Sequence, residues 1–148
     1  MWQKWYDYDK AILLIRNPCD ACFSYFNYQK TKGGHRKNYK SSNLSEEFKV
    51  YLNECREKWR QFHITWNSKD NFQGEILKVP YEALLSNLES ELHIIADFLN
   101  INLEDKNLEC VLNENLIGPF KRRSTKVISD LIDKNMLEQC EMEQKLFT

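Results

Sequence analysis

Two short runs along the chain have the pattern of strands. Residues Ala11–Ile15 read AILLI without polar alternation, which is typical of a strand buried on both faces in a parallel sheet. The second run, Glu75–Val79, ends at Pro80. Because helical patterns fill the segment between the two runs, we predict that the strands pair in parallel through one crossover connection.

Helix-start residues and apolar spacing predict the helices. Asn17 is a favourable N-cap and Pro18 suits the first helical position, so a helix is expected over residues 18–29. A longer helix is predicted to begin near Ser45. Its apolar stripe, which we expect to be core, consists of Phe48, Leu52, Cys55, Trp59, Phe62 and Trp66. Further helices are predicted over residues 88–99, with Asn100 as a left-handed stop, and over 104–113 and 129–146.

These elements predict an α/β fold with two parallel strands in predominantly helical surroundings, within a single domain over residues 1–148. A strand buried on both faces needs paired neighbours and covering helices on both sides. Each exposed aliphatic side chain would forfeit about 1.5–3 kcal/mol. We therefore expect a missing part of the domain, or a partner chain, to complete the sheet.

The composition restricts the partners. Hydrophobic residues make up 42% of the chain and aromatic residues 13%, which excludes a disordered chain. Lys and Arg number 21 against 22 Asp and Glu, so no global charge favours nucleic acid or an anionic membrane. No apolar run approaches the length of a membrane span and the start of the chain lacks a signal-peptide pattern, so the chain as given is expected to be soluble.

The cysteines allow an alternative hypothesis. Five scattered cysteines predict reduced thiols rather than a disulfide framework. Cys19 and Cys22 form a C-x-x-C at a predicted helix start, as in thioredoxin-like dithiol oxidoreductases, where the helix end lowers a thiol pKa. No second close pair accompanies them, so no metal site is predicted.

The sharpest candidate site is the turn from Arg16 to Asp20, followed by Ser24. Arg16 stands at the carboxyl end of the first strand, where open α/β sheets bind ligands, and a guanidinium can hold a phosphate with two hydrogen bonds. Ser24 lies about 9 Å along the helix from Pro18 at 1.5 Å per residue. One phosphate that touches both side chains would lie beside the first turns. The alternative is an Arg16 paired with Asp7 or Asp20 and a solvated Ser24.

The segment AILLIRNPCDACFSYF resembles the 3′-phosphate-binding segment of sulfotransferases that use 3′-phosphoadenosine-5′-phosphosulfate (PAPS). The resemblance implies that Arg16 and Ser24 bind the 3′-phosphate. The segment ILKVPYEALLSNLESELHIIADFLNI is similar to the second strand and helix of that family, which places Tyr81 near the adenine. A looser match is the late basic loop that closes on the 3′-phosphate, here Lys121, Arg122 and Arg123.

The branch most similar to this chain is that of the carbohydrate-type sulfotransferases in WSC-domain-containing proteins, partly because Gly34-His35 matches a Gly-His loop there. This similarity implies that His35 is an acceptor or loop contact. It also implies that a full-length relative lies in the Golgi membrane with a lumenal catalytic domain.

Family members begin with a strand and a Gly/Ser/Thr-rich loop that cradles the 5′-phosphosulfate. No segment before Lys10 has that pattern, and the catalytic base is unassigned. The resemblance therefore implies the C-terminal part of a P-loop-NTPase-like sulfotransferase fold. Such a part would supply the 3′-phosphate site and be inactive alone. The complete enzyme would transfer a sulfuryl group from PAPS to a hydroxyl or amine acceptor, expected to be a carbohydrate.

A further alternative is a noncatalytic helical adaptor. Its partner would bind the aromatic side chains Trp59, Phe62 and Trp66 together with Trp2 and Trp5. Helical stripes of this kind are more often internal core.

Overall fold

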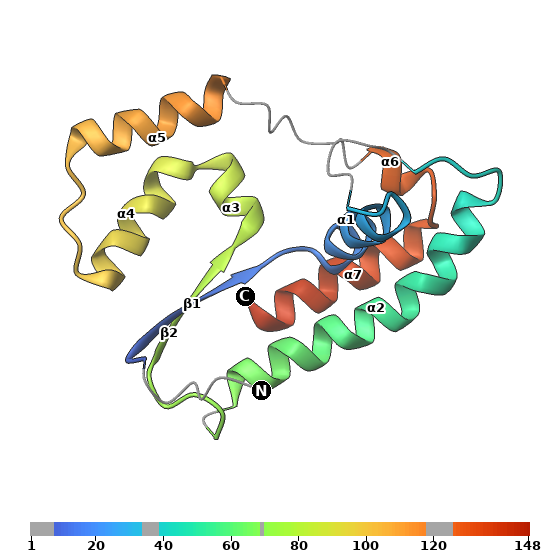
Figure 1. Ribbon diagram of the computed structural model, residues 1–148. Helices are drawn as coiled ribbons and strands as arrows, with labels where there is room; N and C mark the ends of the chain where they lie inside the picture. The colour runs from blue at the N-terminus through green and yellow to red at the C-terminus, as the bar shows by residue number, and fades with distance from the viewer. Residues whose placement is uncertain (1–7, 34–38, 69, 118–125) are drawn as a thin grey trace. The chain divides into compact units, whose positions relative to one another are not determined.

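The computed structural model describes residues 8–33, 39–68, 70–117 and 126–148 (Figure 1). The chain divides into two compact units. Of the described residues, the sheet unit contains 8–15, 70–117 and Thr148, and the helical unit contains 16–33, 39–68 and 126–147. Each unit is described by itself below.

The sheet unit is built on two parallel strands, as predicted. Strand β1 (Lys10–Ile15) pairs with β2 (Glu75–Pro80), with Ile15 opposite Pro80 at the carboxyl edge. Gly74 allows the strands to meet, because a Cβ at this position would lie 2.3 Å from the carbonyl oxygen of Asp9. The hydrogen bond from Glu75 N to that oxygen, 2.8 Å long, begins the pairing.

The side chains of β1 alternate between buried and exposed. Leu13 and Ile15 are 5% and 0% exposed, whereas Ile12 and Leu14 are 40% and 47% exposed. The prediction that this strand is buried on both faces is therefore wrong for the residues that the structure describes. The physical reason is that a two-stranded sheet with covering groups on one side leaves alternate side chains in water.

Among the described residues of the sheet unit, β2 is followed by the helices α3 (Tyr81–Ser86), α4 (Leu88–Leu99) and α5 (Asp105–Ile117). The predicted stop of α4 is confirmed, since Asn100 has φ 57° and ψ 38° in the left-handed region. Lys10 of β1 donates a 2.6 Å hydrogen bond from Nζ to the carbonyl oxygen of Phe98. Its ammonium group also lies 5.2 Å from the centre of the Phe98 ring, which fixes the end of α4 against β1.

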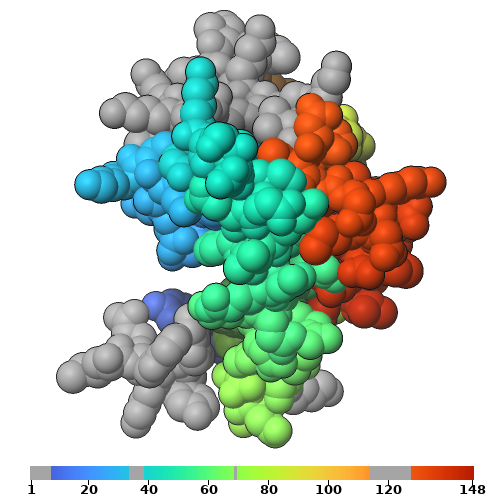
Figure 2. Space-filling view, turned by 90° about the vertical axis from the view of Figure 1, so that its right-hand side faces the viewer, coloured from blue at the N-terminus to red at the C-terminus, as the bar shows by residue number. Residues whose placement is uncertain are grey.

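The helical unit contains α1 (Pro18–Lys30), α2 (Leu44–Asn67), α6 (Lys126–Ser129) and α7 (Lys134–Phe147). Figure 2 shows α2 between α1 and α7 on one face. The first two helices match their predicted positions. The helix predicted over residues 129–146 begins later than expected, at Lys134, and the short helix α6 precedes it. Asp133 marks this start, because its side chain accepts a 2.9 Å hydrogen bond from Met136 N.

The core of the helical unit lies between these helices. Phe48 and Leu52 on α2 are both fully buried, which confirms the first half of the predicted stripe. Phe62, further along the same helix, is 51% exposed, so the second half is only partly core. The buried cluster consists of Cys19, Cys22, Phe26, Phe48, Leu52, Ile128, Ile132 and Cys140.

Polar contacts join the end of α1 to the start of α2. Lys30 Nζ lies 2.7 Å from a carboxylate oxygen of Glu47, and the Ser41 hydroxyl donates to the other oxygen at 2.6 Å. The hydrogen bond from Lys30 and then that from Ser41 lower the pKa of Glu47 below its usual value. The connection between the two helices is therefore held at its α2 end.

Candidate functional site

The candidate phosphate-binding segment begins where β1 ends. Arg16 follows Ile15 directly and is half-buried. Asn17 is the N-cap of α1, as predicted, and Pro18 is the first helical residue. The Asn17 Oδ1 accepts hydrogen bonds from Cys19 N at 2.9 Å and Asp20 N at 3.4 Å.

The main-chain donors in the first turn of α1 are already engaged. Pro18 has no N–H group, Cys19 and Asp20 donate to the Asn17 side chain, and Ala21 N donates to the Asn17 carbonyl at 2.9 Å. A helix start usually offers such groups to an anion. Here an anion would have to be bound by side chains, and Arg16 and Ser24 are the candidates for this role.

Ser24 lies on the exposed surface of α1. It is seven residues after Asn17 and four after Asp20, so all three share one face of the helix. The Asp20 carboxylate one turn away would repel a phosphate bound to the Ser24 hydroxyl. A phosphate at this face therefore needs a positive charge, which Arg16 can supply.

A pocket of about 360 Å³ lies at the start of α1 in the helical unit. Asp20 and Glu141 are among its lining residues, and the main-chain N–H groups of Cys19 and Asp20 are already engaged by the Asn17 side chain. Two carboxylates make this pocket unsuitable for a phosphate. Among the described residues, its lining consists of Asn17, Cys19, Asp20, Ile128, Ser129, Leu137 and Glu141.

Replacing Asn17 with alanine is expected to lower the free energy of unfolding of the helical unit by about 0.5–2 kcal/mol, because two first-turn amides lose their partner. Asn43→Ala is the matched control, since Asn43 is the N-cap residue of α2 and its side chain makes no capping hydrogen bond. Urea unfolding followed by circular dichroism measures both variants. Equal losses in the two would contradict the capping role of Asn17.

Two disulfides contradict the prediction of reduced thiols. Cys19 on α1 is bonded to Cys140 on α7, and Cys22 on α1 is bonded to Cys55 on α2. Cys110 on α5 is free and exposed. The sequence did not indicate either pair, because the bonded cysteines are 121 and 33 residues apart and come together only when the helices pack.

The disulfides also contradict the dithiol oxidoreductase hypothesis. Cys19 and Cys22 are bonded to different helices rather than to each other, and each is only 1% exposed. A C-x-x-C redox site needs a pair that opens and closes within the motif and an accessible thiol. In this chain the motif supplies two structural anchors for α1.

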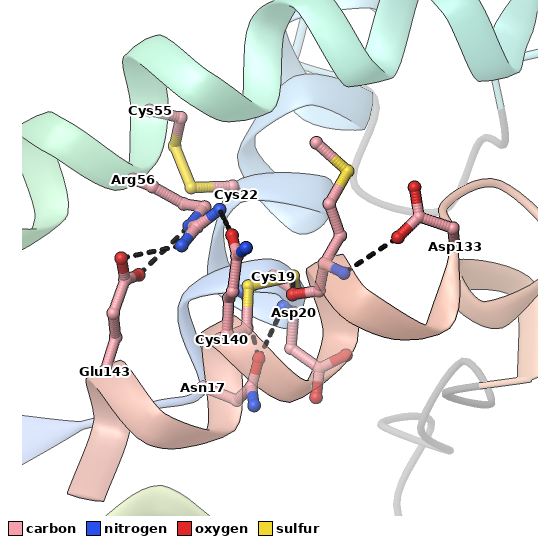
Figure 3. The surroundings of a disulfide bond; sticks show 11 residues. Asn17, Cys19, Asp20, Cys22, Cys55, Arg56, Asp133, Cys140 and Glu143 are labelled. Carbon is pink, nitrogen blue, oxygen red and sulfur yellow. Dashed lines mark hydrogen bonds and ion pairs between the residues drawn. A yellow bond between two sulfur atoms is a disulfide. The ribbon is translucent and has the colours of Figure 1, made fainter.

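An ion pair reinforces the same group of helices. Arg56 Nε and Nη2 donate to the two carboxylate oxygens of Glu143 at 3.0 and 2.7 Å, and Nη1 donates to Gln139 Oε1 at 3.1 Å. The Arg56 side chain is 13% exposed and that of Glu143 is 21% exposed. Figure 3 shows this two-pronged contact from α2 to α7 beside both disulfides. Such a fork geometry fixes two helices more firmly than a single contact.

Sequence reasoning missed the disulfide bonds of Cys55 and Cys140 and the ion pair between Arg56 and Glu143. A signal for one of these residues was present, since Cys55 falls on the apolar stripe of α2 with Phe48. The other three carry no local signal, because their partners are distant in sequence.

Tyr81, the residue predicted to lie near the adenine, is the first residue of α3, directly after Pro80, and is half-buried. His35 and the basic loop residues Lys121, Arg122 and Arg123 lie outside the described residues, as do Trp2 and Trp5.

Within the described ranges, no cluster of three metal-binding side chains is found. In the same ranges no helix combines the length and the apolar character that a membrane crossing requires.

The parallel strand pair and its helical crossover define an α/β protein, and the Arg-Asn-Pro turn after β1 is its most distinctive local feature. A family model described as the sulfotransferase domain matches residues 4–146. The chain therefore belongs to the sulfotransferase domain family, which confirms the resemblance seen in the sequence.

Individual relatives agree with this assignment. WSCD family member AAEL009094 of Aedes aegypti is 33% identical over 124 residues, covering 74% of this chain and 35% of the relative. WSCD family member CG9164 of Drosophila melanogaster is 26% identical over 147 residues, covering 96% of this chain and 44% of the relative. The chain thus spans less than half the length of these curated relatives. No solved structure matches the chain significantly.

Proposed function

We propose that this chain is the 3′-phosphate-binding half of a PAPS-dependent sulfotransferase domain. The observation that carries the proposal is the placement of Arg16 and Ser24: Arg16 directly follows the carboxyl end of β1, and Ser24 lies on the exposed surface of α1 about two helical turns later. Membership of the sulfotransferase domain family supports this chemistry.

In the proposed nucleotide complex, Arg16 and Ser24 bind the 3′-phosphate and Tyr81 packs near the adenine. The basic residues Lys121, Arg122 and Arg123 close on the same phosphate, and His35 contacts the acceptor or its loop. All of these roles follow from matches to family motifs at those positions.

In the complete enzyme, the acceptor oxygen or nitrogen would form a bond to the sulfur of PAPS as the bond from sulfur to the 5′-phosphate oxygen breaks. The products are the sulfated acceptor, adenosine 3′,5′-bisphosphate and a proton. We propose a carbohydrate acceptor, by analogy with the carbohydrate-type branch that the sequence resembles. Because this half lacks the phosphosulfate-binding motif, it is proposed to position the nucleotide without catalysing transfer alone.

The exposed side of β1 supports the proposal that a further part of the domain, or a partner chain, completes the sheet. Ile12 and Leu14 leave two large aliphatic side chains 40% and 47% exposed on one strand. Covering them would recover part of the 1.5–3 kcal/mol that burial of each such side chain is worth, roughly in proportion to the area removed from water.

We also propose that the complete protein works in the lumen of the Golgi. Two buried disulfides support an oxidising compartment, because such bonds persist in secretory compartments and are rare in the cytosol. This support is independent of the family resemblance.

Calorimetric titration tests the nucleotide proposal. The oxidised chain is expected to bind adenosine 3′,5′-bisphosphate at least about tenfold more tightly than adenosine 5′-monophosphate, since one charged phosphate contact is worth about 1.5–3 kcal/mol. Adenosine 2′,5′-bisphosphate is the matched control ligand, with the same charge at a different position. Equal affinity for all three nucleotides would refute a 3′-phosphate site in this chain.

A further inference from the structure

Three links join α1, α2 and α7 in a closed triangle. The Cys19–Cys140 bond joins α1 to α7, the Cys22–Cys55 bond joins α1 to α2, and the Arg56–Glu143 ion pair joins α2 to α7. Arg56 follows Cys55 directly, and Glu143 lies three residues after Cys140 on α7. Figure 3 shows the three links gathered in one region of the helical unit. Two of the three links are covalent.

The covalent links lie within the candidate phosphate-binding segment. Cys19 is three residues after Arg16, and Cys22 is two residues before Ser24. Both cysteines are 1% exposed, so their side chains point into the helical core, while Ser24 lies on the exposed surface of the same helix. The two bonds therefore restrict the rotation of α1 about its axis and with it the side of the unit from which Ser24 projects.

The restricted rotation matters because the first turn of α1 offers an anion no unengaged main-chain donor. An anion held by side chains alone depends on the relative placement of two groups about two helical turns apart. A small rotation of α1 would bring Asp20, on the same face as Ser24, closer to the phosphate. The affinity for an anion therefore depends more on the placement of these side chains than it does at a helix start whose main-chain N–H groups are available.

We propose that the Cys19–Cys140 and Cys22–Cys55 disulfides are positioning bonds for the 3′-phosphate site, so that nucleotide affinity depends on the thiol redox state of the chain. The proposal rests on the proposed function. Reduction by a dithiol such as dithiothreitol adds two electrons and two protons to each disulfide, and the reductant becomes a cyclic disulfide. Of the three links, only the Arg56–Glu143 ion pair survives this step.

The test compares the oxidised and reduced forms of the full chain. Peptide mapping without reduction first verifies the two bonds, and circular dichroism measures helix content in both forms. Reduction is expected to weaken binding of adenosine 3′,5′-bisphosphate by about tenfold, the equivalent of one charge-assisted hydrogen bond, while helix content is retained. Binding of adenosine 5′-monophosphate is expected to stay the same, and reoxidation with oxidised glutathione is expected to restore the bisphosphate affinity.

Two double variants separate the bonds. Cys19→Ala with Cys140→Ala opens one bond, and Cys22→Ala with Cys55→Ala opens the other. Each is expected to weaken bisphosphate binding. Cys110→Ala is the matched control, because Cys110 is free and exposed, and its affinity is expected to equal that of the parent in both redox states.

The outcomes distinguish the two proposals. If the oxidised chain prefers the 3′-phosphate and reduction leaves the affinity unchanged, the positioning role is refuted and the proposed function stands. Loss of affinity together with helix content would also refute positioning, since the bonds would then hold the fold as a whole. If the oxidised chain shows no 3′-phosphate preference, the proposed function fails and the positioning role fails with it.

Discussion

Replacing Cys19 and Cys140 together with alanine lowers the free energy of unfolding of the helical unit by about 2–5 kcal/mol, as expected from the removal of a native disulfide. The bond closes a loop of 121 residues, and a long loop restricts the unfolded chain most. Both sulfur atoms are also in the buried core, so their loss leaves a small cavity. The effect is large against a typical total stability of about 5–15 kcal/mol.

Tryptophan fluorescence during urea unfolding measures this loss in the unit concerned. In a background with Trp2→Phe and Trp5→Phe, the remaining tryptophans, Trp59 and Trp66, both lie on α2. Trp59 packs against Phe147 of α7, with ring centres 5.4 Å apart, so it reports the separation of these helices. Cys110→Ala serves as the control. An unchanged urea midpoint in the double variant would mean that the bond does not stabilise the unit.

The local elements of the fold could be predicted from the sequence because their signals are local. Asn17 and Pro18 predict a helix start through the capping hydrogen bonds that the structure contains. Asn100 predicts a left-handed stop for the same kind of reason, since its short polar side chain tolerates a positive φ. The parallel pairing of β1 and β2 followed from the helices between them.

The contacts that hold the helical unit could not be predicted, because they join residues far apart in the chain. Cys19 and Cys22 were interpreted as thiols of one motif, whereas α7 and α2 supply their partners. The exposed side of β1 was missed for a related reason. An aliphatic run shows that both faces of a strand could be buried, but it does not show how many strands and helices are present to cover them. Sequence patterns therefore predicted elements well and cross-links poorly.

The same distinction between local and long-range signals applies to the candidate site. Arg16 and Ser24 could be proposed from the sequence because a strand end and a helix spacing are both visible within nine residues. That the main-chain donors beside them are engaged required the hydrogen bonds of Asn17. In the proposed nucleotide complex, the positive charge of the Arg16 guanidinium therefore offsets the repulsion between the phosphate and the Asp20 carboxylate.

Arg16→Ala is expected to weaken binding of adenosine 3′,5′-bisphosphate by about 10- to 100-fold, since a hydrogen bond to a charged group contributes about 1.5–3 kcal/mol and 1.4 kcal/mol is a factor of ten. Binding of adenosine 5′-monophosphate, which lacks the 3′-phosphate, is expected to change little. The bisphosphate affinity of Arg16→Lys is expected to lie between those of the parent chain and the alanine variant, because lysine keeps the positive charge but lacks the planar fork of the guanidinium. Calorimetric titration at constant salt measures all three proteins.

Arg60→Ala is the matched control, because Arg60 is an exposed arginine on α2 of the same unit and its partner is Glu57. It removes the same charge at a distance from the Arg16 turn in sequence, so a general loss of positive charge would weaken binding in both variants. A selective effect of Arg16→Ala, with unchanged circular dichroism, assigns the loss to the phosphate contact. Equal bisphosphate affinity in Arg16→Ala and the parent chain would remove Arg16 from the site.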